Sequence, residues 1–363
     1  MPQQQFSPLQ DLDGLFPDHL AIFCPIPLTF HPSGPSAYEE PAARWAVGHQ
    51  LCAPGSRMTR AGFGRFIAAG MPHITGEAGL AMTYYTYWAL LWDDHLDSFA
   101  GNLAPVIELT AEANRVMYEP AAAPLSDDKW LTSLRDLRGV MERCLSPDGM
   151  EMVRSENTQW MGAQLWKLAM QQRTAPPSVG EYLRMRWPKC GAGPLAAYTA
   201  PGAGYLLSPA ELYDPAVRAF TLSVFHPCTI INDLMSLFKE ESPGQRQVNI
   251  LTAVATEGGL GLPDALFRVW ELYERMVGVM LRLQQRLLVD PRPAVARYAA
   301  ELPQWIPSTI DFSANSARYL ETRKVSFTPP AITMSDTPFL WDQSDLTPPP
   351  YPDIAWWWQQ CTR

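Results

Sequence analysis

Two clusters of oxygen-bearing side chains are the residues of this 363-residue chain best suited to chemistry. The first runs from Trp92 to Asp97 and reads Trp-Asp-Asp-His-Leu-Asp, and the second runs from Asn232 to Glu240. Each follows an apolar, helix-compatible run, where acidic side chains are costly unless another group compensates them. Two such clusters facing one cavity would bind hard divalent cations and, through them, a phosphate-bearing ligand.

The first cluster continues a predicted buried helix. Residues 77–92 are apolar and contain no proline, a pattern that favours a helix inside a core. Continuing that helix puts Asp93 and Asp97 on one face, with Asp94 turned away by roughly 100°. Mg²⁺ prefers this kind of site, because it takes one or two carboxylates and keeps waters or phosphate oxygens. The alternative is a helix end in solvent, which the apolar lead-in disfavours.

The second cluster has a stricter spacing. It follows another buried helix pattern at 219–231, and Asn232, Ser236 and Glu240 recur every four residues. On a helix they span an arc of about 80°, so an amide oxygen, a hydroxyl and a carboxylate would form a one-sided chelate. Lys239 lies beside them and would offer a point charge to phosphate. The alternative interpretation is a polar stripe on a surface helix.

The two clusters resemble the aspartate-rich motif and the Asn-Ser-Glu motif of class I terpene synthases (terpene cyclases) of the microbial type. In that family the two motifs hold three Mg²⁺ ions, which bind the diphosphate of a linear prenyl substrate. Lys239 matches the basic position that contacts the diphosphate. The resemblance implies six metal ligands: Asp93, Asp94, Asp97, Asn232, Ser236 and Glu240.

Two more positions match the family's order and spacing. Arg186 lies 46 residues before Asn232, where the family usually carries a diphosphate-sensing arginine. Arg318 and Tyr319 match the family's Arg-Tyr pair, 86 residues after Asn232 for the arginine. An arginine fork grips phosphate oxygens in pairs and stays charged, which suits both positions. A segment at 23–32 is similar to the one before the first helix of bacterial members, so the resemblance covers roughly residues 20–325.

The chain departs from the family pattern at two places. After the sensor arginine, where members often carry a small acidic or hydroxyl residue and then glycine, this chain has Lys189 and Cys190 before Gly191. Many members also place an aromatic residue three or four positions before the first aspartate, and here those positions are Ala89 and Leu90. The second departure indicates a roomier cavity or stabilisation of cations by other rings.

The resemblance implies a mechanism in which bound diphosphate leaves and an allylic carbocation cyclises in a dry pocket. Aromatic faces can stabilise the moving charge. Phe312 is the ring best placed for this, one or two turns before Arg318 on the same predicted helix. For the remaining candidates, ordinary core packing is the favoured alternative, and they are Phe63 or Phe66, Tyr87 or Trp88, Trp160 and Trp305. No side chain stands out as a general base.

The composition of the chain argues against several other classes of protein. A net charge of −9 and a pI of about 5.2, without a basic stripe, argue against nucleic-acid binding. The six cysteines are scattered with no Cys-x-x-Cys pair, so we expect free thiols in a reducing compartment. No signal peptide and no membrane-spanning run are predicted, which favours a cytoplasmic protein. A homodimer is left open.

The body of the chain predicts an all-α, single-domain helical bundle around a central active-site cavity. We expect a flexible N-terminus at 1–20, a catalytic domain at 21–325 and a Pro/Trp-rich tail at 326–363. The tail is predicted to be a lid over the pocket mouth, a flexible segment or a partner-binding segment, because seven prolines precede three consecutive tryptophans. The predicted helices are 39–53, 57–70, 76–98, 127–145, 148–172, 208–240, 262–289 and 295–321.

The predicted activity is a carbon–oxygen lyase reaction that converts a linear prenyl diphosphate to a cyclic terpene. Farnesyl diphosphate is favoured as the commoner substrate of microbial cyclases, and geranylgeranyl diphosphate is the alternative that Ala89 and Leu90 support. A chain-elongating prenyl transferase would need a second aspartate-rich motif, which the Asn-Ser-Glu motif replaces. A non-catalytic isoprenoid-binding or scaffold protein would be expected to have defective metal ligands, and none of the six is defective.

Overall fold

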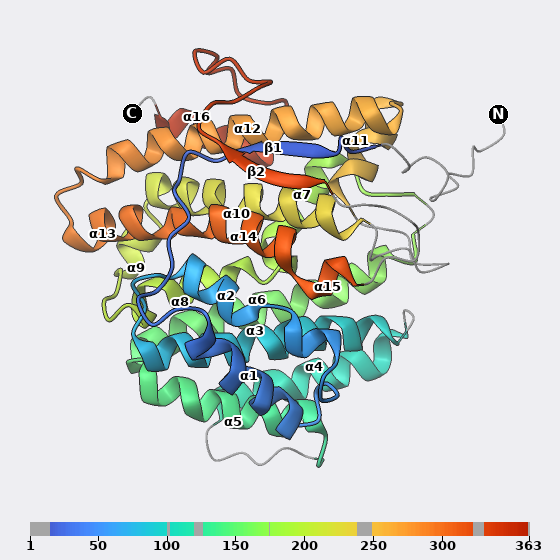
Figure 1. Cartoon of the computed structure of the whole chain (residues 1–363), viewed down its shortest axis with the longest axis vertical. Coiled ribbons are helices and arrows are strands. Elements are labelled where there is room, and N and C mark those ends of the chain that lie inside the picture. Colours follow the sequence, from blue (N-terminus) through green and yellow to red (C-terminus); the bar gives the residue numbers. More distant parts are fainter. Residues whose placement is uncertain are drawn as a thin grey trace.

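The structure, a computed structural model, describes residues 15–99, 102–119, 126–173, 175–237, 249–321 and 330–361. Helices dominate this part of the chain, and its two strands are five residues long each. The predicted all-α fold is therefore confirmed. Figure 1 shows the helices stacked in a lower and an upper group, with α2, α14 and α15 in the middle of the molecule, where the groups meet.

The lower group is built around α3 (Gly76–Asp97), which is buried along most of its length. Its interior side chains include Trp88 and Trp92, which have no exposed surface. Helices α1 and α5 pack on α3, α4 packs on α5 and α6, and α6 packs on α8. These helices are α1 (Ser36–Gly48), α4 (Leu103–Tyr118), α5 (Lys129–Cys144), α6 (Pro147–Met170) and α8 (Ala192–Gly202).

The upper group is built around α10 (Pro215–Ser236), which is apolar on nearly every face and packs most extensively against α12 (Leu262–Leu287). A helix that is apolar all round belongs in a core. Asp214 begins α10 by accepting hydrogen bonds from the backbone of Ala216 and Val217, and a proline follows at the first helical position. Helices α7 (Val179–Lys189) and α11 (Ile250–Gly258) complete this group.

Helix α14 (Trp305–Asn315) joins the two groups, because it packs against both α10 and α2 (Phe63–Gly70). The predicted helix at 295–321 is wrong as one element. It divides into α13 (Pro293–Glu301), the 3₁₀ turn η2 (Leu302–Gln304), α14 and α15 (Ala317–Leu320). Ser316 has extended backbone and caps α15 through its side chain, so Phe312 and Arg318 lie on different helices.

Two other predicted helices also correspond to two separate elements each. The predicted helix at 57–70 is the 3₁₀ turn η1 (Arg57–Arg60) followed by α2, and the one at 208–240 is α9 (Pro209–Leu212) followed by α10. The single helices predicted at 76–98, 148–172 and 262–289 match α3, α6 and α12 within two residues at each end. Helices α4, α7, α8, α11 and α16 (Pro352–Cys361) were not predicted.

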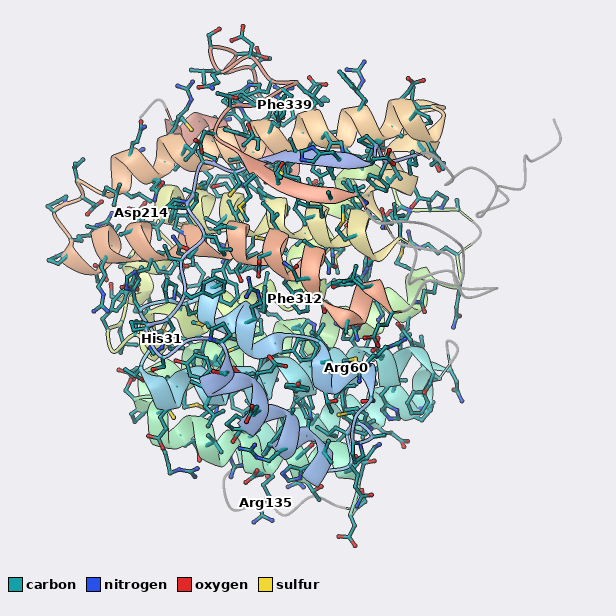
Figure 2. The ribbon with its side chains drawn as sticks, in the orientation of Figure 1. His31, Arg60, Arg135, Asp214, Phe312 and Phe339 are labelled. Atoms are coloured by element: carbon teal, nitrogen blue, oxygen red, sulfur yellow. The ribbon has the colours of Figure 1, made fainter. Side chains whose placement is uncertain are left out.

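The described part of the C-terminal segment is packed against the body. Strand β2 (Ala331–Ser335) pairs in parallel with β1 (His19–Phe23), and α16 packs on α7, α10 and α12. The Glu274 carboxylate on α12 accepts hydrogen bonds from the backbone N–H groups of Phe339, Leu340 and Trp341. Phe339 itself points away from the body at the upper edge of the molecule (Figure 2).

The predicted lid function of this segment stays a prediction. None of its described residues lines the central cavity, and residues 322–329, which precede it, lie outside the described part of the chain. At the other end, Leu15 and Phe16 are buried, so the described end of the 1–20 segment is packed. In the described residues, no helix combines the length and the apolar character needed to cross a membrane.

Candidate active site

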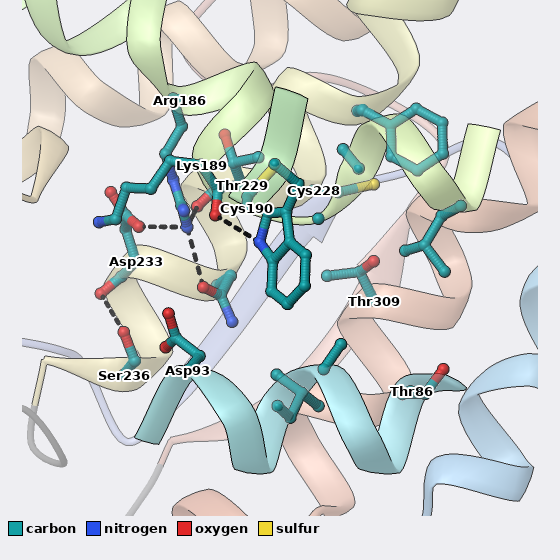
Figure 3. A pocket seen from close by; sticks show the side chains of 18 of the residues that line it. Thr86, Asp93, Arg186, Lys189, Cys190, Cys228, Thr229, Asp233, Ser236 and Thr309 are labelled. Atoms are coloured by element: carbon teal, nitrogen blue, oxygen red, sulfur yellow. Dashed lines mark hydrogen bonds and ion pairs between the residues drawn. The ribbon is translucent and has the colours of Figure 1, made fainter. Parts of the chain in front are cut away.

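A large, open-mouthed cavity lies between the two groups of helices. Its empty volume is about 1550 Å³, a value that includes open solvent at the mouth. Side chains from α2, α3, α6, α7, α8, α10, α14 and α15 line it. Figure 3 shows Asp93 on α3 along one wall, with Arg186, Asp233 and Ser236 on the facing wall. The structure thus brings segments more than 200 residues apart to one cavity.

The α3 wall carries two of the three predicted aspartates. Asp93 and Asp97 line the cavity, and their side chains are 31% and 27% exposed. Asp94 is not among the lining residues, because its carboxylate faces Arg318. This matches the helical prediction that Asp93 and Asp97 share a face from which Asp94 is turned away.

A buried lysine that the sequence did not single out holds the two cavity-lining aspartates. Lys167 on α6 places its Nζ 2.7 Å from Asp93 Oδ1 and 2.9 Å from Asp97 Oδ1. Gln171, one turn further on, donates to the same Asp97 oxygen. Burial lowers the pKa of Lys167, but the two carboxylates outweigh it, so the pKa lies above the ordinary lysine value and the ammonium stays charged.

The α10 wall is organised by Arg186. Its Nη2 lies 2.6 Å from Asp233 Oδ1 and donates to Asn232 Oδ1 at 2.9 Å. The other Asp233 oxygen accepts hydrogen bonds from the Tyr182 hydroxyl and the Ile250 backbone. Asp233 was not predicted as a site residue, yet its two oxygens fix both the guanidinium and the start of α11. Its position next to Asn232 was the only available signal.

Arg318 and Tyr319 approach from α15. The two terminal nitrogens of Arg318 donate to the two oxygens of Asp94, at 2.6 and 2.8 Å. The Tyr319 hydroxyl accepts a hydrogen bond from Asn232 Nδ2 at 2.8 Å. Arg318 therefore joins α15 to the aspartate-rich motif, and Tyr319 joins it to the Asn-Ser-Glu motif. Arg318, Tyr319 and Arg186 all line the cavity.

Aromatic rings line the apolar part of the cavity. Of the predicted candidates, Phe66, Trp160, Trp305 and Phe312 line it, whereas Phe63, Tyr87 and Trp88 lie in the core behind it. Phe312 lies near the centre of the molecule (Figure 2), with its ring centroid 5.0 Å from that of Phe66 and 5.7 Å from that of Tyr319. The sequence reading missed two further lining rings, Tyr85 and Phe225.

The hydroxyl groups of the cavity wall donate their protons back to their own helices. Thr86, Thr229 and Thr309 bond the carbonyl oxygens of Met82, His226 and Trp305 at 2.7–2.9 Å. The ring N–H of Trp160 donates to the Lys189 carbonyl at the α7–α8 break, and that of Trp305 donates to Thr199. At these three threonines the hydroxyl proton is used within the helix and only oxygen lone pairs remain available, which suits a nearby cation.

The donor set around the cavity mouth fits a hard divalent cation. Asp93, Asp97, Asn232 and Ser236 line the cavity and supply carboxylate, amide and hydroxyl oxygens. Among the described residues, no three His, Cys, Asp or Glu side chains form one compact metal cluster. Two predicted residues, Lys239 and Glu240, lie outside the described residues.

Comparison with known proteins identifies the family of this chain. The model of terpene synthase family 2, C-terminal metal binding, matches residues 84–278, more than half of the chain. The chain belongs to the terpene synthase family. It is 29% identical to bonnadiene synthase of Allokutzneria albata, over 93% of this chain and 96% of that protein. Other relatives include an enzyme described as farnesyl diphosphate cyclizing and another named a diterpene cyclase.

Solved structures of terpene synthases share the fold. A mutant protein from ancestral sequence reconstruction superposes with a TM-score of 0.81 at 22% identity, covering 94% of this chain and 98% of that one. The 2-methylisoborneol synthase of Streptomyces coelicolor, solved with Mg²⁺ and 2-fluoroneryl diphosphate, gives a TM-score of 0.74 at 21% identity. It covers 83% of this chain and 98% of its own. The resemblance read from the motifs is confirmed, and this terpene synthase is an enzyme of the lyase class.

Proposed function

We propose that this terpene synthase ionises a linear prenyl diphosphate with the help of divalent metal and cyclises the resulting cation. One observation carries the proposal: oxygen donors from two walls, two arginines and several aromatic rings line one cavity. The relative from Streptomyces coelicolor was solved with Mg²⁺ and a prenyl diphosphate analogue, which supports the same class of ligand here. We propose Mg²⁺, three ions in number, as the metal.

Each part of the site has a role in this proposal. Asp93 and Asp97 on one wall, and Asn232 and Ser236 on the other, would hold the metal, which supplies charge neutralisation of the leaving diphosphate. Glu240 is a further proposed metal ligand. Asp94, the second aspartate of the motif, would contribute through its ion pair with Arg318.

Positively charged side chains would bind the diphosphate. Arg186 and Arg318 both line the cavity, and each would turn part of its fork from its present carboxylate partner to phosphate oxygens. Tyr319 would donate a hydrogen bond, and Lys239 is proposed to add a charge. These contacts strengthen as negative charge collects on the departing group, so they favour the transition state over the bound substrate.

The apolar part of the cavity would fold and protect the cation. Phe312, Phe66, Trp160 and Trp305 present faces or edges to the space beyond Asp93. Their rings are held in place: the two indoles by hydrogen bonds from their N–H groups, and Phe312 by contact with the rings of Phe66 and Tyr319. Fixed rings stabilise positive charge without reorganising, and they exclude water that would quench it.

The wall next to the aspartates favours a C20 substrate over the C15 substrate expected from the sequence. Ala89 and Leu90 line the cavity one turn before Asp93, and the small residues Gly191 and Ala192 line it after the α7–α8 break. An aromatic side chain at any of these positions would fill space that a longer prenyl chain needs. We therefore propose geranylgeranyl diphosphate as the preferred substrate and farnesyl diphosphate as the second candidate.

The test is incubation of purified protein with Mg²⁺ and, separately, C10, C15, C20 and C25 linear prenyl diphosphates, with products identified by gas chromatography–mass spectrometry. We expect a cyclic hydrocarbon or alcohol from the C20 substrate, abolished by Asp93→Ala. Asp127→Ala, which removes a carboxylate from an exposed site outside the cavity, is the matched control and should keep full activity. The proposal would be contradicted if Asp93→Ala formed as much product as the wild type, or if the wild type converted none of the four substrates.

A further inference from the structure

Lys167 is a buried cation beside the aspartate-rich motif. It comes from α6, 74 residues away from Asp93 along the chain, and only 5% of it is exposed. Its ammonium touches one oxygen of Asp93 and one of Asp97, the two motif carboxylates that line the cavity. A full positive charge therefore already lies between the carboxylates proposed to receive a metal ion.

The ammonium and a metal ion would compete for these carboxylates. Mg²⁺ binds carboxylate oxygens at 2.0–2.1 Å, whereas Lys167 Nζ lies 2.7 Å from Asp93 Oδ1 and 2.9 Å from Asp97 Oδ1. A metal on either oxygen would lie within a few ångströms of the ammonium, and the two positive charges would repel in a partly buried site. Metal binding at this pair is therefore disfavoured while the Lys167 ammonium stays in place.

Lys167 has a place to go. It lines the cavity itself, and its four-carbon stem has several rotatable bonds, so the ammonium can turn into the cavity that Arg186 also lines. In the empty cavity that movement would leave two carboxylates behind and gain nothing in exchange. When a diphosphate occupies the cavity, its negative charge offers the displaced ammonium a new partner.

We propose that Lys167 is a built-in counter-ion that competes with divalent metal for Asp93 and Asp97 and couples metal binding to the presence of diphosphate. The inference rests on the proposed function, because it assumes that these aspartates receive the metal. It predicts weak metal binding by the empty protein and much tighter binding once diphosphate is present. By linkage, metal would tighten diphosphate binding by the same factor.

The test measures metal affinity directly, without turnover. Mn²⁺ is titrated into the protein and free Mn²⁺ is followed by electron paramagnetic resonance, with and without inorganic diphosphate. Without diphosphate, Lys167→Gln should bind Mn²⁺ roughly 10-fold more tightly than the wild type. Lys129→Gln makes the same charge change at an exposed lysine and should match the wild type. Adding Asp93→Asn to Lys167→Gln should remove the gain.

The outcomes separate the inference from the proposed function. Equal Mn²⁺ affinity for the wild type and Lys167→Gln would overturn the inference, while cyclisation by the wild type would leave the function standing. If Lys167→Gln does not fold, Lys167→Arg keeps the charge and must bind Mn²⁺ no more tightly than the wild type. Tighter binding by Lys167→Arg would overturn the inference. Absence of Mn²⁺ binding by every variant, even with diphosphate, would remove both proposals.

Discussion

The ion pair between Arg318 and Asp94 should show an asymmetry that its burial dictates. The Arg318 side chain is 3% exposed, whereas the Asp94 side chain is 32% exposed. Removing one partner of a buried pair is costly mainly because the other charge is left without compensation. Asp94→Asn removes the main carboxylate partner of an almost fully buried guanidinium, but Arg318→Met leaves a carboxylate that water can solvate. The first change should therefore cost more stability than the second.

The structure sets the magnitudes. Breaking a buried pair costs roughly 3–5 kcal/mol, and Asp93 also attracts Arg318, so we expect the lower end, about 3 kcal/mol, for Asp94→Asn. For Arg318→Met we expect about 1–2 kcal/mol, because the remaining carboxylate is partly solvated and Met keeps much of the packing. The double variant should be more stable than Asp94→Asn alone, with a coupling energy of about 2 kcal/mol.

Urea unfolding followed by far-ultraviolet circular dichroism measures these free energies in all four proteins of the cycle. Arg60→Met is the matched control: Arg60 pairs with Glu321 at 2.8 Å, but both side chains are about half exposed. Its loss should cost at most about 1 kcal/mol. Equal losses for the two single variants, or strict additivity in the double variant, would refute the reasoning from burial.

Three further predictions test separate features. Burial lowers the pKa of His226 to about 4; protonation therefore favours the unfolded chain, and about 3 kcal/mol of stability present above pH 6.5 should be lost as pH falls toward 4. His226→Gln should lose less stability on titration from pH 7 to pH 4.5 in urea melts, and an unchanged pH dependence would contradict this. Gly278→Val would place its side chain against the Trp341 ring, so stability should fall by about 1–3 kcal/mol. Limited proteolysis should then cut the C-terminal segment sooner than in the wild type; equal cleavage would count against this packing. Phe312→Leu should change the mixture of cyclic products without abolishing diphosphate release, and an unaltered product profile would remove Phe312 from the cavity chemistry.

The sequence could predict the fold class and the cavity-lining motif residues because both depend on local spacing. Residues four apart on a helix share a face, so the placement of Asp93 and Asp97 on the cavity side of α3 was accessible from the pattern alone. The arginine positions followed from the family resemblance. The structure brings Arg186, Arg318 and Asn232 to the same cavity, as that resemblance implied.

Long-range contacts of residues outside any recognisable motif could not be predicted from the sequence. Nothing around Lys167 distinguishes it from a surface lysine, and its ion pairs depend on how α6 packs beside α3. The break at Ser316 was missed because no proline or glycine marks it, although a serine is a common first cap of a helix. The packing of the C-terminal segment depends on Glu274, whose role as a carboxylate anchor appears only in three dimensions.

The central claim is that the two walls of the cavity jointly hold metal and diphosphate. Its most direct test is a crystal structure of the wild-type protein with Mn²⁺ and inorganic diphosphate, with the metal located by anomalous scattering. We expect anomalous peaks beside Asp93 on α3 and beside Asn232 and Ser236 on α10, bridged by a diphosphate in contact with Arg186. Diphosphate bound without metal at Asp93 and Asn232, or metal bound outside this cavity, would contradict the account.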